Sequence, residues 1–296
     1  MSNFEKSSSS TSKSQGDVKS SSDFEDYVWA LSIMSIGYSG RGLVYAVIAC
    51  VSFWSLWWGG EAEGTKSALE SLNGIAGSIL VATIAVGLFS FAAWRFISCF
   101  WDLEEYGTDA KGLVVRAGLL VIGVVHLGLG AIAIAALGVV RSEGQSEYSM
   151  SDLMQSSIGP WIVGCVGIST MIAGLIYLYK SISGSYRDSL QANHFTVHWN
   201  PVLRIGLAAQ GISLGIIGGL ILYAALTIDA SKAGGLGAAF EWLHNQAYGR
   251  FLVVALCLGL IAFSLVCFVN AAYRIVPKAS DSSVQNLTTR LAAEQA

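Results

Sequence analysis

Gly37-Tyr-Ser-Gly-Arg-Gly-Leu-Val-Tyr45 opens the first of six long apolar runs, and related segments open the third and the fifth. These are Arg116-Ala-Gly-Leu-Leu-Val-Ile-Gly-Val-Val-His126 and Arg204-Ile-Gly-Leu-Ala-Ala-Gln-Gly-Ile-Ser-Leu214. In each segment a glycine is followed by another five residues later, and the first glycines are 81 and 88 residues apart. Self-similarity at a nearly fixed period indicates tandem copies of one structural unit.

A second landmark repeats in the even-numbered runs. It comprises Gly87-Leu-Phe-Ser-Phe91, Gly174-Leu-Ile-Tyr-Leu178 and Gly259-Leu-Ile-Ala-Phe263, which are 87 and 85 residues apart. Two independent landmarks with similar periods predict three copies of a two-helix unit, over residues 30–105, 110–190 and 198–276. Residues 1–22 are rich in Ser and Lys, so we expect a disordered tail there, and residues 277–296 form a second polar tail.

Six apolar runs carry these landmarks, and each has about 20 or more residues. They are roughly Ile36–Trp58, Gly74–Phe100, Leu113–Val140, Ile158–Tyr179, Val202–Ile228 and Phe251–Tyr273. Such runs cross ~30 Å of hydrocarbon as helices, because lipid leaves backbone groups no partner except their own helix. Charged residues make up 12% of the chain, about half the usual share of a soluble domain. The sequence therefore predicts an all-α integral membrane protein with six transmembrane helices.

The lysines and arginines predict the orientation. Thirteen lie in the two tails, the second and fourth loops and the adjoining helix ends, and four lie on the opposite side. The positive-inside rule predicts that both termini lie in the cytoplasm. We expect the chain in the plasma or inner membrane. Since two helices return the chain to its starting side, the copies are parallel, and we expect a pseudo-threefold axis along the membrane normal.

The three outer loops also share a pattern, in which apolar residues precede a glycine. The residues are Ala68, Leu69 and Leu72 before Gly74, Leu153, Met154 and Ile158 before Gly159, and Phe240 and Leu243 before Gly249. This pattern predicts a short amphipathic helix on the outer interface in each copy.

The first copy resembles the bacterial membrane family known as domain-of-unknown-function family 1206. The family pattern is Gly-Tyr-x-x-Arg-Gly-x-x-Tyr at the start of one helix, an aliphatic loop helix, and Gly-Leu…Trp-Arg at the end of the next. The matching residues are Gly37, Tyr38, Arg41, Gly42, Tyr45, Gly87, Trp94 and Arg95. The resemblance covers about residues 30–275, although the later copies have Ile122 and Gln210 in place of Arg41. It implies the fold and the topology, and no activity.

Several polar side chains near or within the runs are candidates for function: Tyr38, Arg41, Tyr45, Arg95, Arg116 and Arg204. The arginines are interpreted either as a cationic mouth for an anionic solute or lipid headgroup, or as snorkelling side chains that fix the topology. Tyr38 and Tyr45 flank Arg41 at helical spacing, so either tyrosine is placed to bond or stack with it.

His126 lies within the third run, beyond its midpoint, where an ionisable residue suggests a function. It could ligate haem or carry a proton, but a neutral histidine bonded to a neighbouring helix fits equally well, and no second histidine lies within the runs. His194 and His198 have the i, i+4 spacing of a zinc pair, but Thr196, Val197 and Pro201 argue against a helix there. The five cysteines are scattered through apolar runs, so we expect neither a functional disulfide nor a metal site among them. We expect no cofactor.

Three classes of function follow from these features. The first is a non-catalytic membrane protein that acts in assembly or binding, because no catalytic motif is present and no Asp or Glu lies within the six runs. The second is a channel or small-solute carrier with a path along the repeat axis. The third is a haem or redox protein that uses His126. The expected partners are the lipid bilayer and either another membrane protein or a second copy. The net charge of -3 gives no reason to expect nucleic acid.

Overall fold

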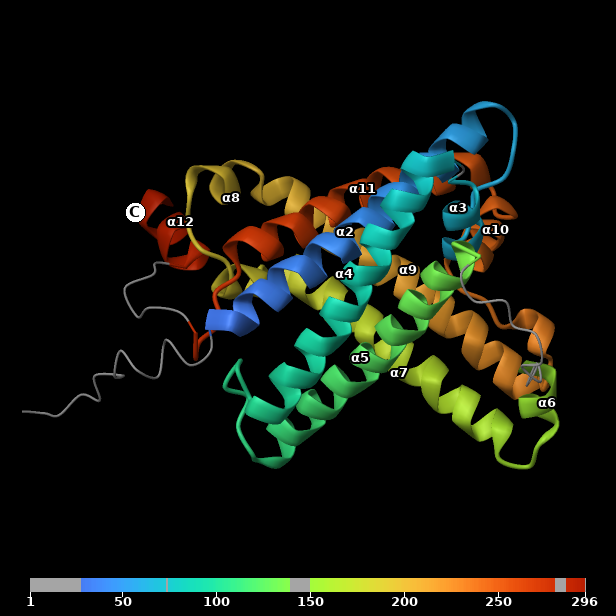
Figure 1. Cartoon of the computed structure of the whole chain (residues 1–296), viewed down its shortest axis with the longest axis horizontal. Coiled ribbons are helices and arrows are strands. Elements are labelled where there is room, and N and C mark those ends of the chain that lie inside the picture. Colours follow the sequence, from blue (N-terminus) through green and yellow to red (C-terminus); the bar gives the residue numbers. More distant parts are fainter. Residues whose placement is uncertain (1–27, 73, 139–149, 280–285, 296) are drawn as a thin grey trace, which may run out of the picture.

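The computed structural model describes residues 28–72, 74–138, 150–279 and 286–295, and its long segments are helices (Figure 1). Six of these helices are long and apolar enough to cross a membrane, which confirms the six predicted helices. They are α2 (Val28–Trp57), α4 (Gly74–Trp101), α5 (Ala110–Ala136), α7 (Gly159–Ser183), α9 (Asn200–Thr227) and α11 (Gly249–Tyr273). The predicted tail at residues 1–22 lies outside the described residues.

Local chemistry sets several of the helix ends. The side chain of Asp109 accepts a hydrogen bond from the backbone N–H of Gly112 and caps the start of α5. Pro160 and Pro201 lie in the first turns of α7 and α9. A backbone N–H has no acceptor within the helix at these positions, so a proline there costs no hydrogen bond. Gly184 ends α7 with a φ of 76°, a left-handed conformation that glycine adopts without strain.

The three predicted loop helices are present. They are α3 (Thr65–Glu70), α6 (Met150–Gln155) and α10 (Leu236–His244), and each buries an apolar side chain: Leu69, Met154 and Phe240 respectively. We call the end of the bundle that carries them the loop-helix end; it also holds the short turn η2 (Ala230–Lys232).

A glycine at the start of each even helix lets the preceding connection approach closely. A Cβ on Gly159 would collide with the carbonyl of Leu153, and a Cβ on Gly249 with that of His244. In the first copy the corresponding glycine is Gly77, whose Cβ would lie 2.6 Å from the carbonyl oxygen of Leu72. The predicted glycine, Gly74, instead adopts a φ of 79° and has open space around it.

The opposite end, which we call the tail end, holds the start of α2, the connections 102–109 and 184–199, and residues 274–279. It also carries η1 (Ser185–Ser189), α8 (His194–His198) and α12 (Leu287–Gln295). Two isolated bridges, Leu190 to Arg274 and Gln191 to Asn286, tie these segments together.

The long helices pack in a cyclic order. α4 packs on α5, α7 on α9, and α11 on α2, so each repeat contacts the next and the third contacts the first. The two helices of repeat 1 also pack together, as do those of repeat 3. In the described part of repeat 2, by contrast, α5 and α7 do not pack along their lengths. The arrangement is a six-helix ring in pseudo-threefold order that is open between α5 and α7.

Equivalent glycines show this difference directly. A Cβ on Gly37 would lie 2.6 Å from the Cα of Phe91, and one on Gly206 would lie 2.6 Å from the backbone of Phe263. Both glycines therefore permit close crossings inside their own repeats. Gly118 holds the same position in repeat 2, but no described atom outside the adjoining turns of its own helix lies within 4 Å of the Cβ that it lacks.

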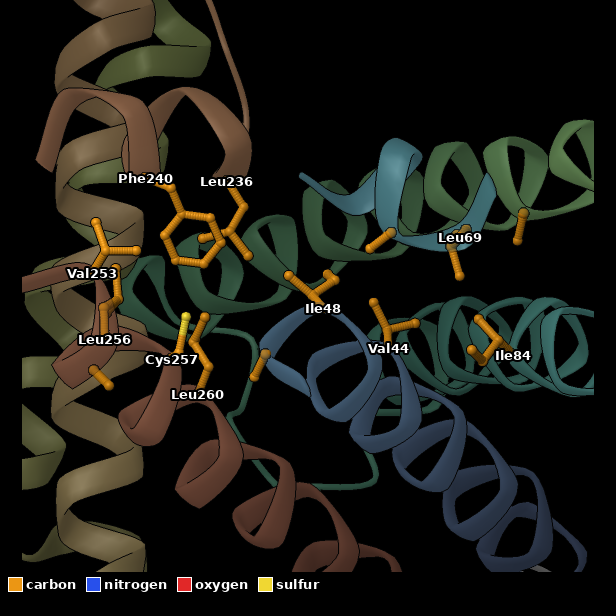
Figure 2. Close-up of a cluster of buried hydrophobic side chains, with 14 of the residues drawn as sticks. Val44, Ile48, Leu69, Ile84, Leu236, Phe240, Val253, Leu256, Cys257 and Leu260 are labelled. Atoms are coloured by element: carbon orange, nitrogen blue, oxygen red, sulfur yellow. The ribbon is translucent and has the colours of Figure 1, made fainter. Parts of the chain in front are cut away.

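The interior toward the loop-helix end is apolar and well packed (Figure 2). Val44 and Ile48 of α2 and Ile84 of α4 belong to this core, and Leu69 of α3 lies beside Val44 and Ile84, whereas Phe240 of α10 lies over the α11 residues. Val253, Leu256, Cys257 and Leu260 contribute from α11. This apolar core lies on one side of a group of buried polar residues at the centre of the ring.

Candidate functional site

A group of polar and aromatic side chains meets at the centre of the ring, and every long helix contributes to it. We call it the central cluster. It consists of Arg41 and Tyr45 from α2, Phe91 from α4, His126 from α5, Tyr177 from α7, Gln210 from α9 and Phe263 from α11.

The repeat itself brings these residues together. Arg41 and Gln210 both lie four residues after the first glycine of their copies, and Tyr45 and His126 both lie eight residues after it. In the even helices, Phe91 and Phe263 lie four residues after the glycine of the Gly-Leu landmark. Because the copies are parallel, side chains at equivalent positions face the same pseudo-threefold axis and meet near it.

Arg41 is the buried cation of the cluster, and its side chain lies among aromatic rings. Its guanidinium carbon lies 5.0 Å from the ring centroid of Phe263 and 5.1 Å from that of Phe91. The corresponding distances are 5.7 Å to Tyr45 and 6.0 Å to Tyr177. Nη2 of Arg41 donates to the Tyr177 hydroxyl at 3.1 Å. Among the described residues no carboxylate lies within ion-pair distance, and the buried Nε–H has no acceptor.

Tyr45 links Arg41 to a second residue with an unpaired group. Nε2 of Gln210 donates to the Tyr45 hydroxyl at 2.8 Å, and the buried Oε1 of Gln210 has no donor among the described residues. The cluster therefore holds a buried unpaired donor on Arg41 and a buried unpaired acceptor on Gln210. Such groups are uncommon in folded interiors because each costs about 1–3 kcal/mol.

His126 lies at the edge of the central cluster. Its ring centroid is 4.5 Å from that of Phe91, and Nδ1 lies 2.7 Å from the carbonyl oxygen of Ile122, one turn earlier on the same helix. Because a carbonyl only accepts, Nδ1 carries a hydrogen and donates it to Ile122.

A second polar group lies on the tail-end side of the cluster, and here the charges are paired. Arg95 donates from Nη2 to the Tyr38 hydroxyl at 2.8 Å and lies 3.8 Å from a carboxylate oxygen of Glu104. Arg274 forms a closer pair with Glu104, at 2.8 Å, and the Tyr106 hydroxyl donates to the same carboxylate. The arginine side chains thus share a single buried acid.

These partners shift the pKa of Glu104. Burial alone would raise it, but the Arg274 and Arg95 guanidiniums, with the hydrogen bond from Tyr106, lower the pKa to about 2. The pKa of Tyr106 is raised, first by burial and then by the adjacent carboxylate. The carboxylate is therefore ionised at neutral pH and neutralises one of its two arginines.

Arg116 and Arg204 lie apart from the cluster, and each binds the end of a neighbouring helix. Nε of Arg116 donates to the carbonyl of Cys99 at 2.8 Å, at the end of α4. Nε of Arg204 donates to the carbonyl of Ser181 at 2.6 Å, at the end of α7. A cation at these unsatisfied carbonyls is favourable, so both arginines cap the helix of the preceding repeat.

The segment around His194 and His198 differs from expectation, because it is a short helix, α8. The Asn193 side chain accepts from the backbone N–H of Thr196, whose hydroxyl accepts from the backbone N–H of Asn193. This capping box outweighs the β-branched residues. The histidine rings lie 6.2 Å apart, and no group of three or more potential metal ligands occurs among the described residues.

Of the predicted residues, the fold brings Arg41, Tyr45 and His126 into the central cluster. It places Tyr38 and Arg95 in the paired network beside it, and it separates Arg116, Arg204 and the α8 histidines from both. The partners that sequence reasoning missed are Phe91, Tyr177, Gln210 and Phe263. The repeat alignment is the available signal for all four, because each lies at or beside an equivalent position.

The six apolar helices and the three-copy ring define a class of multi-pass, all-helical membrane protein with internal repeats. The chain belongs to the family described as Domain of Unknown Function (DUF1206), whose model matches residues 36–102, 117–184 and 205–274. It is also similar to the uncharacterized protein YxxB of Bacillus subtilis (strain 168). The two are 23% identical over 252 residues, which cover 83% of this chain and 92% of that protein. No solved structure matches the chain significantly.

Proposed function

We propose that the protein is a non-catalytic, membrane-embedded binding protein that holds a small anion against Arg41. The observation that supports this most is a buried guanidinium with no acidic partner among the described residues. An arginine at the centre of a bilayer costs at least about 2.5 kcal/mol on insertion scales, and such residues commonly mark ligand or ion sites.

The surrounding rings offset part of that cost. Cation–π contacts contribute roughly 0.5–2 kcal/mol each, and the Tyr177 hydroxyl supplies one hydrogen bond. They leave the net charge unchanged: the arginines at positions 41, 95 and 274 face one buried carboxylate, Glu104. A small anion would balance this excess.

The unpaired groups beside Tyr45 suggest the chemistry of the ligand. The Nε–H of Arg41 needs an acceptor, and Oε1 of Gln210 needs a donor. An anion that also carries a hydroxyl, such as dihydrogen phosphate or bicarbonate, satisfies both groups. The ligand's route runs between α5 and α7, the neighbouring pair of long helices that does not pack along its length.

The other classes fit the same geometry less well. A conducting path along the axis would have to pass both the caged Arg41 and the apolar core around Ile48 and Ile84. A haem on His126 would have to displace the Phe91 ring or the neighbouring α4 surface. Purified protein with a Soret absorption band would favour the haem class over ours.

The proposed setting is the inner membrane of a bacterial cell, with the tail end on the cytoplasmic side. The excess of lysine and arginine around that end supports this orientation. Reporter tags at both termini should be active only in the cytoplasm, and an external signal from either would contradict it.

Ligand-dependent thermal stability tests the proposal. Purified full chain in detergent would be titrated with sodium phosphate, bicarbonate, sulfate or acetate at constant ionic strength. We expect phosphate or bicarbonate to raise the unfolding midpoint of the wild type, by an amount equivalent to about 2.7 kcal/mol at one hundred times Kd. Arg116→Met is the matched control, because it removes an arginine outside the cluster and should keep the response.

Arg41→Met should abolish the response. The proposal fails if no anion shifts the wild-type midpoint, or if Arg41→Met responds as the wild type does.

A further inference from the structure

A second cationic site lies at the tail end, between the end of α7 and the start of α9. It is an open groove of about 440 Å³. Its polar wall includes Ser181, Arg187, Asn200 and Arg204, and its apolar wall includes Pro201 and Ile205. Two arginines facing one hollow beside an exposed apolar surface distinguish this site from the central cluster.

Arg187 is held in place without using most of its donors. Its Nε donates to Oδ1 of Asn200 at 3.0 Å, and Tyr186 donates to the same oxygen at 2.6 Å. The guanidinium carbon lies 5.7 Å from the Tyr186 ring. Among the described residues, the terminal nitrogens of Arg187 have no hydrogen-bond partner, so they remain available to a ligand.

Arg204 contributes a second guanidinium with spare capacity. Its Nε and Nη2 cap α7 by donating to the carbonyls of Ser181 and Ile182, which leaves Nη1 for another acceptor. The neighbouring acid, Asp188, accepts a hydrogen bond from Thr288 of α12. Among the described residues it forms no ion pair with Arg187.

The groove lies at the ends of two membrane-spanning helices, α7 and α9. Its arginines give it a cationic part, which adjoins an apolar wall. Planar guanidiniums favour phosphate oxygens, and Ile205 is 59% exposed beside them. We propose that this groove binds the phosphate of an anionic phospholipid, with an acyl chain along the α9 surface at Ile205.

The equivalent arginine in repeat 2 provides an internal control. Arg116 caps α4 through the carbonyls of Cys99 and Phe100, as Arg204 caps α7. However, the connection that follows α4, residues 102–109, contains four acidic residues and no arginine. Of these two helix junctions, α4–α5 and α7–α9, only α7–α9 therefore brings two guanidiniums together.

Native mass spectrometry of the purified full chain tests this inference. The protein would be titrated with phosphatidylglycerol, with phosphatidylcholine and with inorganic phosphate. We expect the wild type to retain phosphatidylglycerol in preference to phosphatidylcholine. Arg187→Gln should weaken phosphatidylglycerol binding about tenfold, because it removes a charge-assisted contact. Arg187→Lys should restore part of the binding.

The control Arg116→Gln should bind phosphatidylglycerol as the wild type does. The inference is overturned if Arg187→Gln binds normally, or if Arg116→Gln loses as much affinity, since either result would mean general charge attraction. It is also overturned if inorganic phosphate displaces the lipid at equal concentration. Arg41→Met leaves the groove intact, so this proposal and the central anion site can fail separately.

Discussion

Arg41 and Arg95 contact the same aromatic ring, yet their surroundings differ in one decisive respect. Their guanidinium carbons lie 5.1 Å and 4.7 Å from the Phe91 centroid. Arg95 has a carboxylate nearby, in Glu104, whereas Arg41 has none among the described residues. A buried charge that is paired is explained by the fold, whereas an unpaired one requires another explanation. For that reason we assign ligand binding to Arg41 and a structural role to Arg95.

Glu104 allows a test of that structural role through pH. Its folded pKa of about 2 lies below the ordinary glutamate value of 4.5, so the ionised carboxylate stabilises the fold above about pH 4.5. This stability is lost as the pH falls from about 4.5 to about 2, and the shift corresponds to roughly 3 kcal/mol. Chemical denaturation of wild type and Glu104→Gln should therefore differ by about that much at pH 7.

The difference should shrink toward pH 2, where the wild-type carboxyl is also protonated. A constant difference across this range would contradict the assigned network, since the loss would then come from packing rather than charge.

Part of the site could be predicted from residues alone. Tyr45 follows from Arg41 by helical spacing and does lie beside it. Tyr38, which the same spacing placed beside Arg41, instead accepts a hydrogen bond from Arg95. The aromatic partners Phe91 and Phe263 lie on other helices, 50 and 222 residues away, where no local signal connects them to Arg41. The ion-paired network around Glu104 has no such signal either, because loop acids carry no pattern that identifies an arginine on another helix as their partner.

At the scale of elements, the apolar runs predicted the long helices well because length and hydropathy determine membrane-spanning helices. α2 begins eight residues before its predicted run, since the mostly apolar segment Val28–Ser35 continues the same helix. The opening between α5 and α7 could not be predicted. Repeat 2 has the same glycine, Gly118, that permits the crossings in the other repeats.

Substituting these equivalent glycines tests the observed packing. Gly206→Ala should destabilise the protein, because its Cβ would press on the backbone of α11. Gly118→Ala has open space and should be neutral or stabilising by up to about 1 kcal/mol, since alanine favours helix more than glycine does. Thermal unfolding of both variants in detergent measures the difference. Equal destabilisation would mean that α5 and α7 are closed in the membrane.

At the scale of the whole molecule, the three copies combine a shared scaffold with one distinct centre. Glycines at equivalent positions form the helix crossings of repeats 1 and 3, whereas the residue at the position of Arg41 differs from copy to copy: Arg41, Ile122 and Gln210. A strictly symmetric axis would place three arginines together, and their repulsion would be prohibitive without several anions. Divergence of the copies leaves a single cation within an aromatic cage.

The stability of an Arg41→Met, Tyr177→Phe double variant tests the central claim most directly. It removes the buried charge and the hydroxyl that accepts from it, and it leaves no polar group of this pair unpaired. If Arg41 serves a ligand rather than the fold, the variant without any ligand should unfold at the same or a higher temperature. A loss of about 2 kcal/mol or more would mean that the caged guanidinium holds the ring together, and the account would be wrong.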